Sequence, residues 1–241
     1  MNTHNDKSKA EALDSDFIAR RQRARIKVNK LDRDIIHDEP ERTEFFNSVY
    51  DRANDDAAQI PWADLAPKSQ IVDWLAANRG GGHKALDIAC GLGDNAEAIS
   101  AAGYQTIAFD LSSTAIHWAK RRFVDSQVDY QTANLFELPQ SWLNKFDLVN
   151  ECYTLQALPP QMLRQSSSAI ASLVKPGGNL LVYTRLRHQD HSVEGPPWPL
   201  SQQDAFEFAE IGYELVQDER FDIVRGDREI PHQFAHWRKL D

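Results

Sequence analysis

The sequence predicts an α/β protein with a doubly wound, seven-stranded and mostly parallel sheet. Between residues 84 and 184, short apolar runs alternate with segments of helical spacing. Strands that alternate with helices in this way form a parallel sheet with helices on both faces. Because the crossovers of such a sheet are right-handed, few topologies are possible. The second observation is that the first strand ends in a glycine-containing turn, which opens a helix.

The individual elements follow from the apolar runs and from the turn residues that separate them. Strands are expected at 84–90, 104–109, 128–131, 146–149, 179–184, 213–224 and 232–239. Helices are expected at 94–102, 112–123, 160–174 and 201–211. An earlier helix is expected to be capped by Asp64, to hold Pro67 in its first turn and to end at glycines 80–82. The last two strands predict a terminal antiparallel pair, because only a turn-rich segment separates them.

Composition indicates an ordinary globular protein of one domain, or of one domain and an appendage, since the chain has 241 residues. The net charge of −9 argues against a duplex nucleic-acid binder, so no nucleic-acid partner is expected. No apolar run approaches the roughly 18–20 residues that span a bilayer, and no secretory signal is visible. With only two cysteines, Cys90 and Cys152, a cytoplasmic location is expected and no membrane association.

The first 43 residues differ in character from the rest of the chain. We expect residues 1–43 to be a charged N-terminal extension and residues 44–241 to be the folded domain. The run 20–27 is strongly basic, and Phe17 is the only aromatic residue of the extension. Like-charged runs are usually exposed, which favours a mobile tail or a solvated helix. The alternative is a lid helix, whose arginines meet a negative ligand or the acidic body of the protein.

Residues at the ends of the first two strands indicate an adenosine-containing cofactor. Gly91 and Gly93 allow the backbone to approach a ligand closely. Asp110 ends the second strand, 17 residues after Gly93, where an acid can accept hydrogen bonds from both ribose hydroxyls. A dinucleotide is disfavoured because Asp94 places a negative charge where the pyrophosphate would bind. Asp87, in the first strand, suits a ligand with a positive end, such as the ammonium and sulfonium of S-adenosylmethionine.

Four blocks of sequence, in the right order, resemble the class I S-adenosylmethionine-dependent methyltransferases. They lie at 86–93, 108–112, 133–138 with 146–149, and 173–181, and the resemblance covers about residues 45–240. It implies a Rossmann-like methyltransferase sheet, the cofactor S-adenosyl-L-methionine and the product S-adenosyl-L-homocysteine. The family usually has Asp where this chain has Asn134, whose side-chain oxygen can still accept from the adenine amino group. The cofactor-binding residues that the resemblance implies are Trp62, Asp87, Ala89, Gly91, Gly93, Asp110, Leu111, Asn134, Leu135, Phe136 and Glu151.

Three further segments resemble the thiopurine, thiol-halide and tellurite methyltransferase group. They lie at 46–67, 146–160 and 195–201. In that group the tryptophan of a Pro-Trp motif packs near the cofactor, which points to Trp62. The exit of the fourth strand, from Asn150 to Tyr153, lacks the Asn-Pro-Pro-Tyr signature of amino-group and base methyltransferases. A nucleic-acid base is therefore disfavoured as the acceptor.

The expected function is methyl transfer to a small-molecule acceptor by in-line displacement, in which alignment supplies much of the rate. No His and Asp that are near in sequence form an evident base, and a thiolate needs none. A thiol or another soft nucleophile, a selenium, tellurium or halide species, is therefore preferred. Glu151 and Tyr153 are the predicted catalytic residues. The predicted substrate-binding residues are Tyr50, Tyr153, Arg185 and Trp198.

Two other functions stay open at this point. An O- or N-methyltransferase of a specialised metabolite would need a base, and a non-catalytic S-adenosylmethionine-binding module would need only the cofactor motifs. No metal is expected, because the pairs His188/His191 and His232/His236 have no cysteine partners and no His-Glu motif. The chain is expected to be a monomer or a homodimer.

Overall fold

The computed structural model describes residues 15–33, 39–187, 195–225 and 227–241. His188 and His191 lie outside these residues. The chain forms two compact units. The first contains residues up to 81 and 90–134, and the second contains residues 82–89 and 135–241.

The strands form a seven-stranded sheet in the order β3-β2-β1-β4-β5-β7-β6. β1 and β4, β4 and β5, and β2 and β3 pair in parallel. β7 pairs antiparallel with both β5 and β6. The predicted fold, with its mostly parallel sheet and terminal antiparallel pair, is confirmed. The strands are β1 Lys84–Ile88, β2 Gln105–Asp110, β3 Asp129–Thr132, β4 Phe146–Cys152, β5 Val174–Arg185, β6 Tyr213–Arg225 and β7 Arg228–Lys239.

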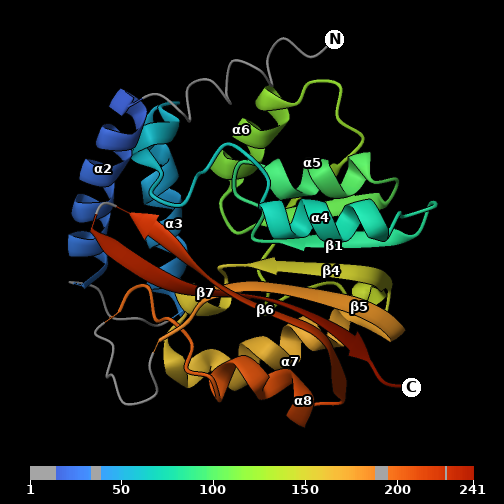
Figure 1. Ribbon diagram of the computed structural model, residues 1–241. Coiled ribbons are helices and arrows are strands. Elements are labelled where there is room, and N and C mark those ends of the chain that lie inside the picture. The colour runs from blue at the N-terminus through green and yellow to red at the C-terminus, as the bar shows by residue number, and fades with distance from the viewer. Residues whose placement is uncertain (1–14, 34–38, 188–194, 226) are drawn as a thin grey trace. The chain divides into compact units, whose positions relative to one another are not determined.

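The helices are divided between the two units. Those of the first unit are α2 Ser15–Arg33, α3 Glu39–Ala53, η1 Ala57–Gln59, α4 Ser69–Ala77, α5 Asp94–Ala101 and α6 Ser113–Arg122. Those of the second unit are η2 Gln140–Trp142, η3 Leu155–Ala157, η4 Pro160–Met162, α7 Leu163–Leu173, η5 Asp204–Phe206 and α8 Glu207–Glu210. Within the second unit, α7 and α8 lie on the same side of the β5–β6–β7 strands (Figure 1). No helix in the described part of the chain is long and apolar enough to cross a membrane.

Two boundaries differ from the sequence prediction for physical reasons. The helix expected to be capped by Asp64 begins only at Ser69, and no side chain caps its first turn. Asp64 binds the ammonium of Lys68 and the guanidinium of Arg21 instead. The fourth strand was expected to end at residue 149, but it runs on to Cys152. Two of the added residues, Asn150 and Glu151, are polar yet buried, so an apolar pattern does not predict them as part of a strand.

In the first unit, helix α2 shares a hydrophobic core with helix α3 and the segment around η1. Phe17 of α2 is 3% exposed and belongs to the same buried cluster as Phe45, Tyr50 and Ile60. Ala24, two turns further along α2, is also buried. One face of α2 is therefore packed against this core, whereas Ile18 and Ile26 of the same helix are exposed. The boundary at residue 43, which falls inside α3, stays a prediction, as does the role of a lid.

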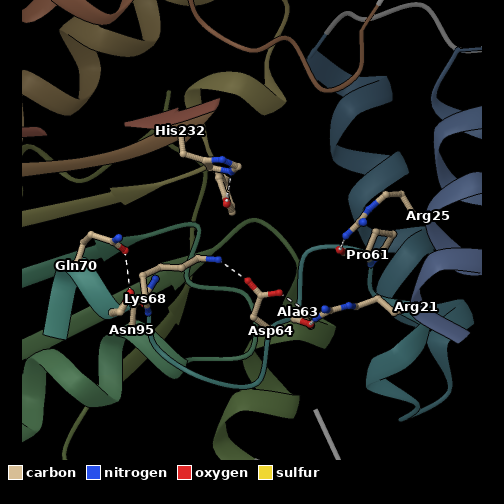
Figure 2. A network of polar contacts seen from close by, with 11 residues as sticks. Arg21, Arg25, Pro61, Ala63, Asp64, Lys68, Gln70, Asn95 and His232 are labelled. Carbon is tan, nitrogen blue, oxygen red and sulfur yellow. Dashed lines mark hydrogen bonds and ion pairs between the residues drawn. The ribbon is translucent and has the colours of Figure 1, made fainter. Parts of the chain in front are cut away.

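Three arginines of the basic run bind the segment 56–64. Arg20 donates two hydrogen bonds to the Asp56 carboxylate, at 2.6 and 2.7 Å. Arg21 donates to Asp64 and to the carbonyl oxygen of residue 63, at 2.9 and 2.7 Å. Arg25 donates to the carbonyl oxygen of residue 61 at 2.7 Å. Figure 2 shows Arg21 and Arg25 reaching from α2 to this segment, which carries Trp62. These three arginines thus bind groups of the same chain.

Replacing Arg21 by alanine is expected to lower the free energy of unfolding by about 1 kcal/mol, because a largely buried side chain loses hydrogen bonds to a carboxylate and a carbonyl. Urea denaturation measures the change. The matched control is Arg23→Ala, which removes an exposed arginine of the same helix. Equal stability of the two variants would contradict the role given to Arg21.

Candidate active site

In the first unit, the carboxylate of Asp110 ties the end of β2 to the glycine turn and to the start of α6. Its Oδ2 accepts from the backbone N–H of Gly91 and its Oδ1 from that of Ser112, both at 2.9 Å. The Ser112 hydroxyl in turn caps α6 by accepting from the N–H of Ala115. One buried side chain therefore holds two backbone segments in place.

Burial raises the pKa of Asp110 to about 6, against the opposing effect of backbone N–H groups from Ser112, Gly91 and Leu111. An ionised carboxylate offers about four acceptor sites, and the two hydrogen bonds at 2.9 Å, from Gly91 and Ser112, use two of them. The remaining sites suit the paired hydroxyls of a ribose. The contact of Asp110 with a ribose stays a prediction.

The glycine turn has the geometry that the sequence predicts. Gly91 and Gly93 have φ of 53° and 90°, in the left-handed region that favours glycine. A Cβ added at Gly91 would lie 3.2 Å from the Tyr50 hydroxyl, which accepts a 2.8 Å hydrogen bond from the Trp62 indole N–H. Burial, and secondarily the charge of Asp110, raises the pKa of Tyr50 well above its usual value. The tyrosine therefore stays protonated beside the turn.

The negative charge that the sequence places at the start of α5 is neutralised within the first unit. Arg122 donates two hydrogen bonds of 2.9 Å to the two carboxylate oxygens of Asp94. It also donates to the carbonyl oxygen of Leu92 inside the turn. The bidentate geometry fixes both the charge and the shape of the turn.

The residues predicted to lie by the adenine follow β3. The N–H of Ala133 donates to the carbonyl oxygen of Asp110 at 3.1 Å, which holds this segment against the end of β2. Asn134 comes next and is half-buried, as is Leu111, which directly follows β2. Of the remaining pair, Leu135 is buried and Phe136 is half-buried. Their contacts with a ligand stay a prediction.

In the second unit, three buried polar residues cluster on β1 and β4. Asn150 donates to a carboxylate oxygen of Asp87 at 2.6 Å, across the paired strands. Glu151 lies within β4, opposite Ile88, rather than after the strand as the sequence suggested. Ala89 follows β1 with a φ of 49°. Acidic side chains at the carboxyl ends of parallel strands occupy the usual ligand-binding edge of such sheets.

Glu151 is fully buried and only partly satisfied. Its Oε1 accepts from the N–H groups of Thr154 and Leu155, at 2.5 and 3.0 Å. Its Oε2 has no hydrogen-bond partner among the described residues. Burial raises the pKa of Glu151 to about 7, the N–H donors oppose this, and the nearby Asp87 charge adds to it. The group can therefore exchange a proton near neutral pH, or accept from a ligand.

Tyr153 lies just beyond β4 in a constrained conformation, with a φ of 69°. Its N–H donates to the carbonyl oxygen of Tyr183 on β5, and its hydroxyl lies 2.9 Å from Nε2 of His232 on β7. The Arg185 guanidinium lies over its ring, 5.8 Å from the centroid. The structure thus brings together Tyr153 and Arg185, which the sequence predicted, and adds His232, which it did not.

Gln156 forms hydrogen bonds with Arg185 and Trp198, two of the predicted substrate-binding residues. Its side-chain oxygen accepts from the N–H of Arg185 at 2.7 Å and from the Thr184 hydroxyl at 3.3 Å. Its carbonyl oxygen accepts from the N–H of Trp198 at 2.7 Å. Sequence reasoning missed Gln156, although a polar residue between Leu155 and an apolar stretch is a usable signal. Among the described residues, no group of three or more His, Cys, Asp or Glu could hold a metal ion.

Part of the chain is similar to a known protein family. Residues 85–178 match the family model described as a methyltransferase domain. The chain therefore has the Rossmann-like methyltransferase fold, and residues 85–178 within it are similar to a methyltransferase domain. The narrower resemblance to the thiopurine, thiol-halide and tellurite group stays a prediction.

The curated relatives are named ubiquinone biosynthesis O-methyltransferases. The protein of Aromatoleum aromaticum is 34% identical over 116 residues, which are 47% of this chain and 49% of that protein. The protein of Dechloromonas aromatica is 28% identical over 185 residues, 75% of this chain and 72% of that protein. The first match therefore spans about half the length of the relative.

Solved structures share the fold at low sequence identity. One, from work on the conversion of a disulfide bond into a thioacetal group during echinomycin biosynthesis, has a TM-score of 0.66 at 20% identity, covering 82% of this chain and 93% of that one. A magnesium protoporphyrin IX methyltransferase from Synechocystis, solved with bound S-adenosylhomocysteine, has a TM-score of 0.58 at 17% identity, covering 70% and 80%.

The raised pKa of Glu151 predicts how stability depends on pH. The folded protein holds this proton more tightly than the unfolded chain, so the free energy of unfolding falls as pH rises from about 4.5 to about 7. Glu151→Gln removes this pH-dependent contribution to the free energy of unfolding, which is up to about 3 kcal/mol. The stability of the variant should therefore change less between these two pH values. Urea denaturation at both ends of the window measures the change. The control is Glu214→Gln at an exposed position. If stability depends on pH in the same way in both variants, the raised pKa is not that of Glu151.

Proposed function

We propose that the chain transfers a methyl group from S-adenosylmethionine to an oxygen atom of a small-molecule acceptor. The observation that carries the cofactor part is the buried Asp110 carboxylate, which holds the glycine turn and keeps acceptor sites for a ribose. The bound cofactor supplies an activated methyl group on a sulfonium. The chain's residues then have to bind, align and exclude water.

The residues fit this cofactor in character. Asp110 takes the ribose, Asn134 accepts from the adenine amino group, and the turn at Gly91 and Gly93 admits the methionine part. Trp62 packs beside the turn through its hydrogen bond to Tyr50. Leu111, Leu135 and Phe136 are the other predicted contacts of the adenosine part of the cofactor.

The acidic residues of the second unit suit the positive groups of the methionine part. Glu151 has a buried Oε2 that no described residue satisfies, and an ammonium is a suitable donor for it. Asp87 adds a second buried carboxylate on the neighbouring strand, before Ala89. The group of buried acids therefore fits a cationic ligand better than an anionic one.

An oxygen acceptor is favoured over the soft nucleophile that the sequence suggested. The relatives are named O-methyltransferases. The preference for a thiol depended on the lack of a base near in sequence, and the contact between Tyr153 and His232 removes that reason. A thiol or related soft acceptor is the second candidate, supported by the resemblance of the segments 46–67, 146–160 and 195–201. We keep a small molecule as the partner, a cytoplasmic location, and a monomer or homodimer as predictions.

Methyl transfer from labelled S-adenosylmethionine to a panel of acceptors tests the proposal. The panel contains phenols, catechols, aliphatic alcohols, amines, small thiols, a thiopurine, iodide, selenite and tellurite. We expect turnover with hydroxyl compounds. Turnover limited to thiols and inorganic soft nucleophiles would support the second candidate, and cofactor binding without any turnover would indicate a binding module.

Asp110→Ala is expected to weaken S-adenosylmethionine binding at least about tenfold in calorimetric titration, because two hydroxyl groups lose a charged acceptor. Ser112→Ala is the matched control: it removes the cap of α6 and leaves the carboxylate in place. Its affinity should stay within threefold of the wild type. Equal affinities for Asp110→Ala and the wild type would refute the ribose assignment.

A further inference from the structure

The hydroxyl of Tyr153 and the imidazole of His232 form a pair that joins the end of β4 to β7. The oxygen and Nε2 are 2.9 Å apart, although the two residues are 79 positions apart in the chain. His232 is 1% exposed, whereas Tyr153 is only half-buried. The tyrosine can therefore meet a ligand, and the histidine can act only through it.

The second ring nitrogen determines which way the proton lies. Nδ1 of His232 is 2.6 Å from the carbonyl oxygen of Ile230. A carbonyl oxygen only accepts, so Nδ1 carries the proton of the neutral ring. Nε2 is then an acceptor, and the Tyr153 hydroxyl donates to it. The tyrosine oxygen, having donated its own proton in this contact, is of the right type to accept a hydrogen bond from a hydroxyl group of a bound acceptor.

The surroundings of the pair hold both rings in place. The Phe221 ring of β6 stacks on the imidazole at 19° and 5.7 Å, and Tyr183 of β5 packs against both rings. Among the described residues, the titratable side chains in ring contact with the imidazole include Tyr153 and Tyr183, and Arg185 pairs with His232 across the strands. On β6, Glu219 lies two residues from Phe221 on the same face of the strand. The Arg185 cation stabilises negative charge that develops on the tyrosine oxygen.

We propose that Tyr153 and His232 form a proton relay that removes the proton of an acceptor hydroxyl during methyl transfer. The acceptor oxygen forms its bond to the methyl carbon as the carbon–sulfur bond breaks, and the sulfur keeps the electron pair. The acceptor proton passes to the Tyr153 oxygen, while the tyrosine proton passes to Nε2 of His232. After product release Tyr153 gives up a proton to solvent and takes back the proton of the imidazolium, which restores both groups. This relay depends on the proposed O-methyl transfer, for which it supplies the base.

The state of the ring can be tested without turnover. Nitrogen NMR of the histidine-labelled protein is expected to show His232 as the neutral tautomer protonated on Nδ1 at pH 8. Tyr153→Phe, which keeps the ring packing, should shift the Nε2 resonance and the midpoint of the His232 titration. The other β7 histidine, His236, is the internal reference, since its Nε2 contacts Asn179. A proton on Nε2 of His232, or a titration that Tyr153→Phe leaves unchanged, would overturn the relay.

Kinetics with a hydroxyl acceptor from the panel complete the test. His232→Gln and Tyr153→Phe should each lower kcat about 100-fold or more, with the KM for S-adenosylmethionine within threefold of the wild type. The acidic limb of the pH–kcat profile should disappear in His232→Gln. The matched controls are His236→Gln on the same strand and Tyr213→Phe, a buried tyrosine bonded to the carbonyl oxygen of Ala171. They should retain both kcat and the pH profile.

The outcomes separate the relay from the proposed function. If the wild type methylates no hydroxyl compound, the proposed O-methyl transfer fails. If the wild type does so and His232→Gln matches His236→Gln in kcat and pH profile, the relay alone is wrong. If His232→Gln does not fold, the NMR comparison of the wild type with Tyr153→Phe decides.

Discussion

The buried carboxylate of Asp110 is the constraint on which the first unit depends. It ends β2, holds the N–H of Gly91 in the turn, and holds the N–H of Ser112 at the start of α6. Burial makes its ionisation costly, as the pKa of about 6 indicates, and only backbone donors offset that cost. A ligand that brings two further donors would stabilise the ionised form. Local architecture and the proposed cofactor site therefore share one side chain.

Tyr50 and Trp62 connect this turn to the N-terminal helix. Trp62 donates to Tyr50 beside Gly91, and the arginines of α2 bind the carbonyl groups and acids on either side of Trp62. The basic run could be recognised in the sequence, but its partners could not. Ion pairs between residues some 40 positions apart leave no periodic signal. For the same reason, Asp64 looked like a helix cap although it binds Arg21 and Lys68.

The sheet and the cofactor motifs could be predicted because each depends on local chemistry. Alternating apolar runs define strands and helices, and glycines with positive φ define the turn. The acceptor side could not be predicted in this way. Glu151 is a polar residue inside a buried strand, and His232 reaches Tyr153 only because β7 returns antiparallel beside β5. The sequence therefore pointed to a soft nucleophile, since it showed no base.

A crystal structure of the protein with S-adenosylhomocysteine tests the central claim most directly, since it locates the ligand without depending on the identity of the acceptor. The account predicts that both ribose hydroxyls lie within hydrogen-bonding distance of the Asp110 carboxylate and that the ligand follows the turn at Gly91 and Gly93. A ribose bound away from Asp110, or a ligand that leaves this turn untouched, would contradict it.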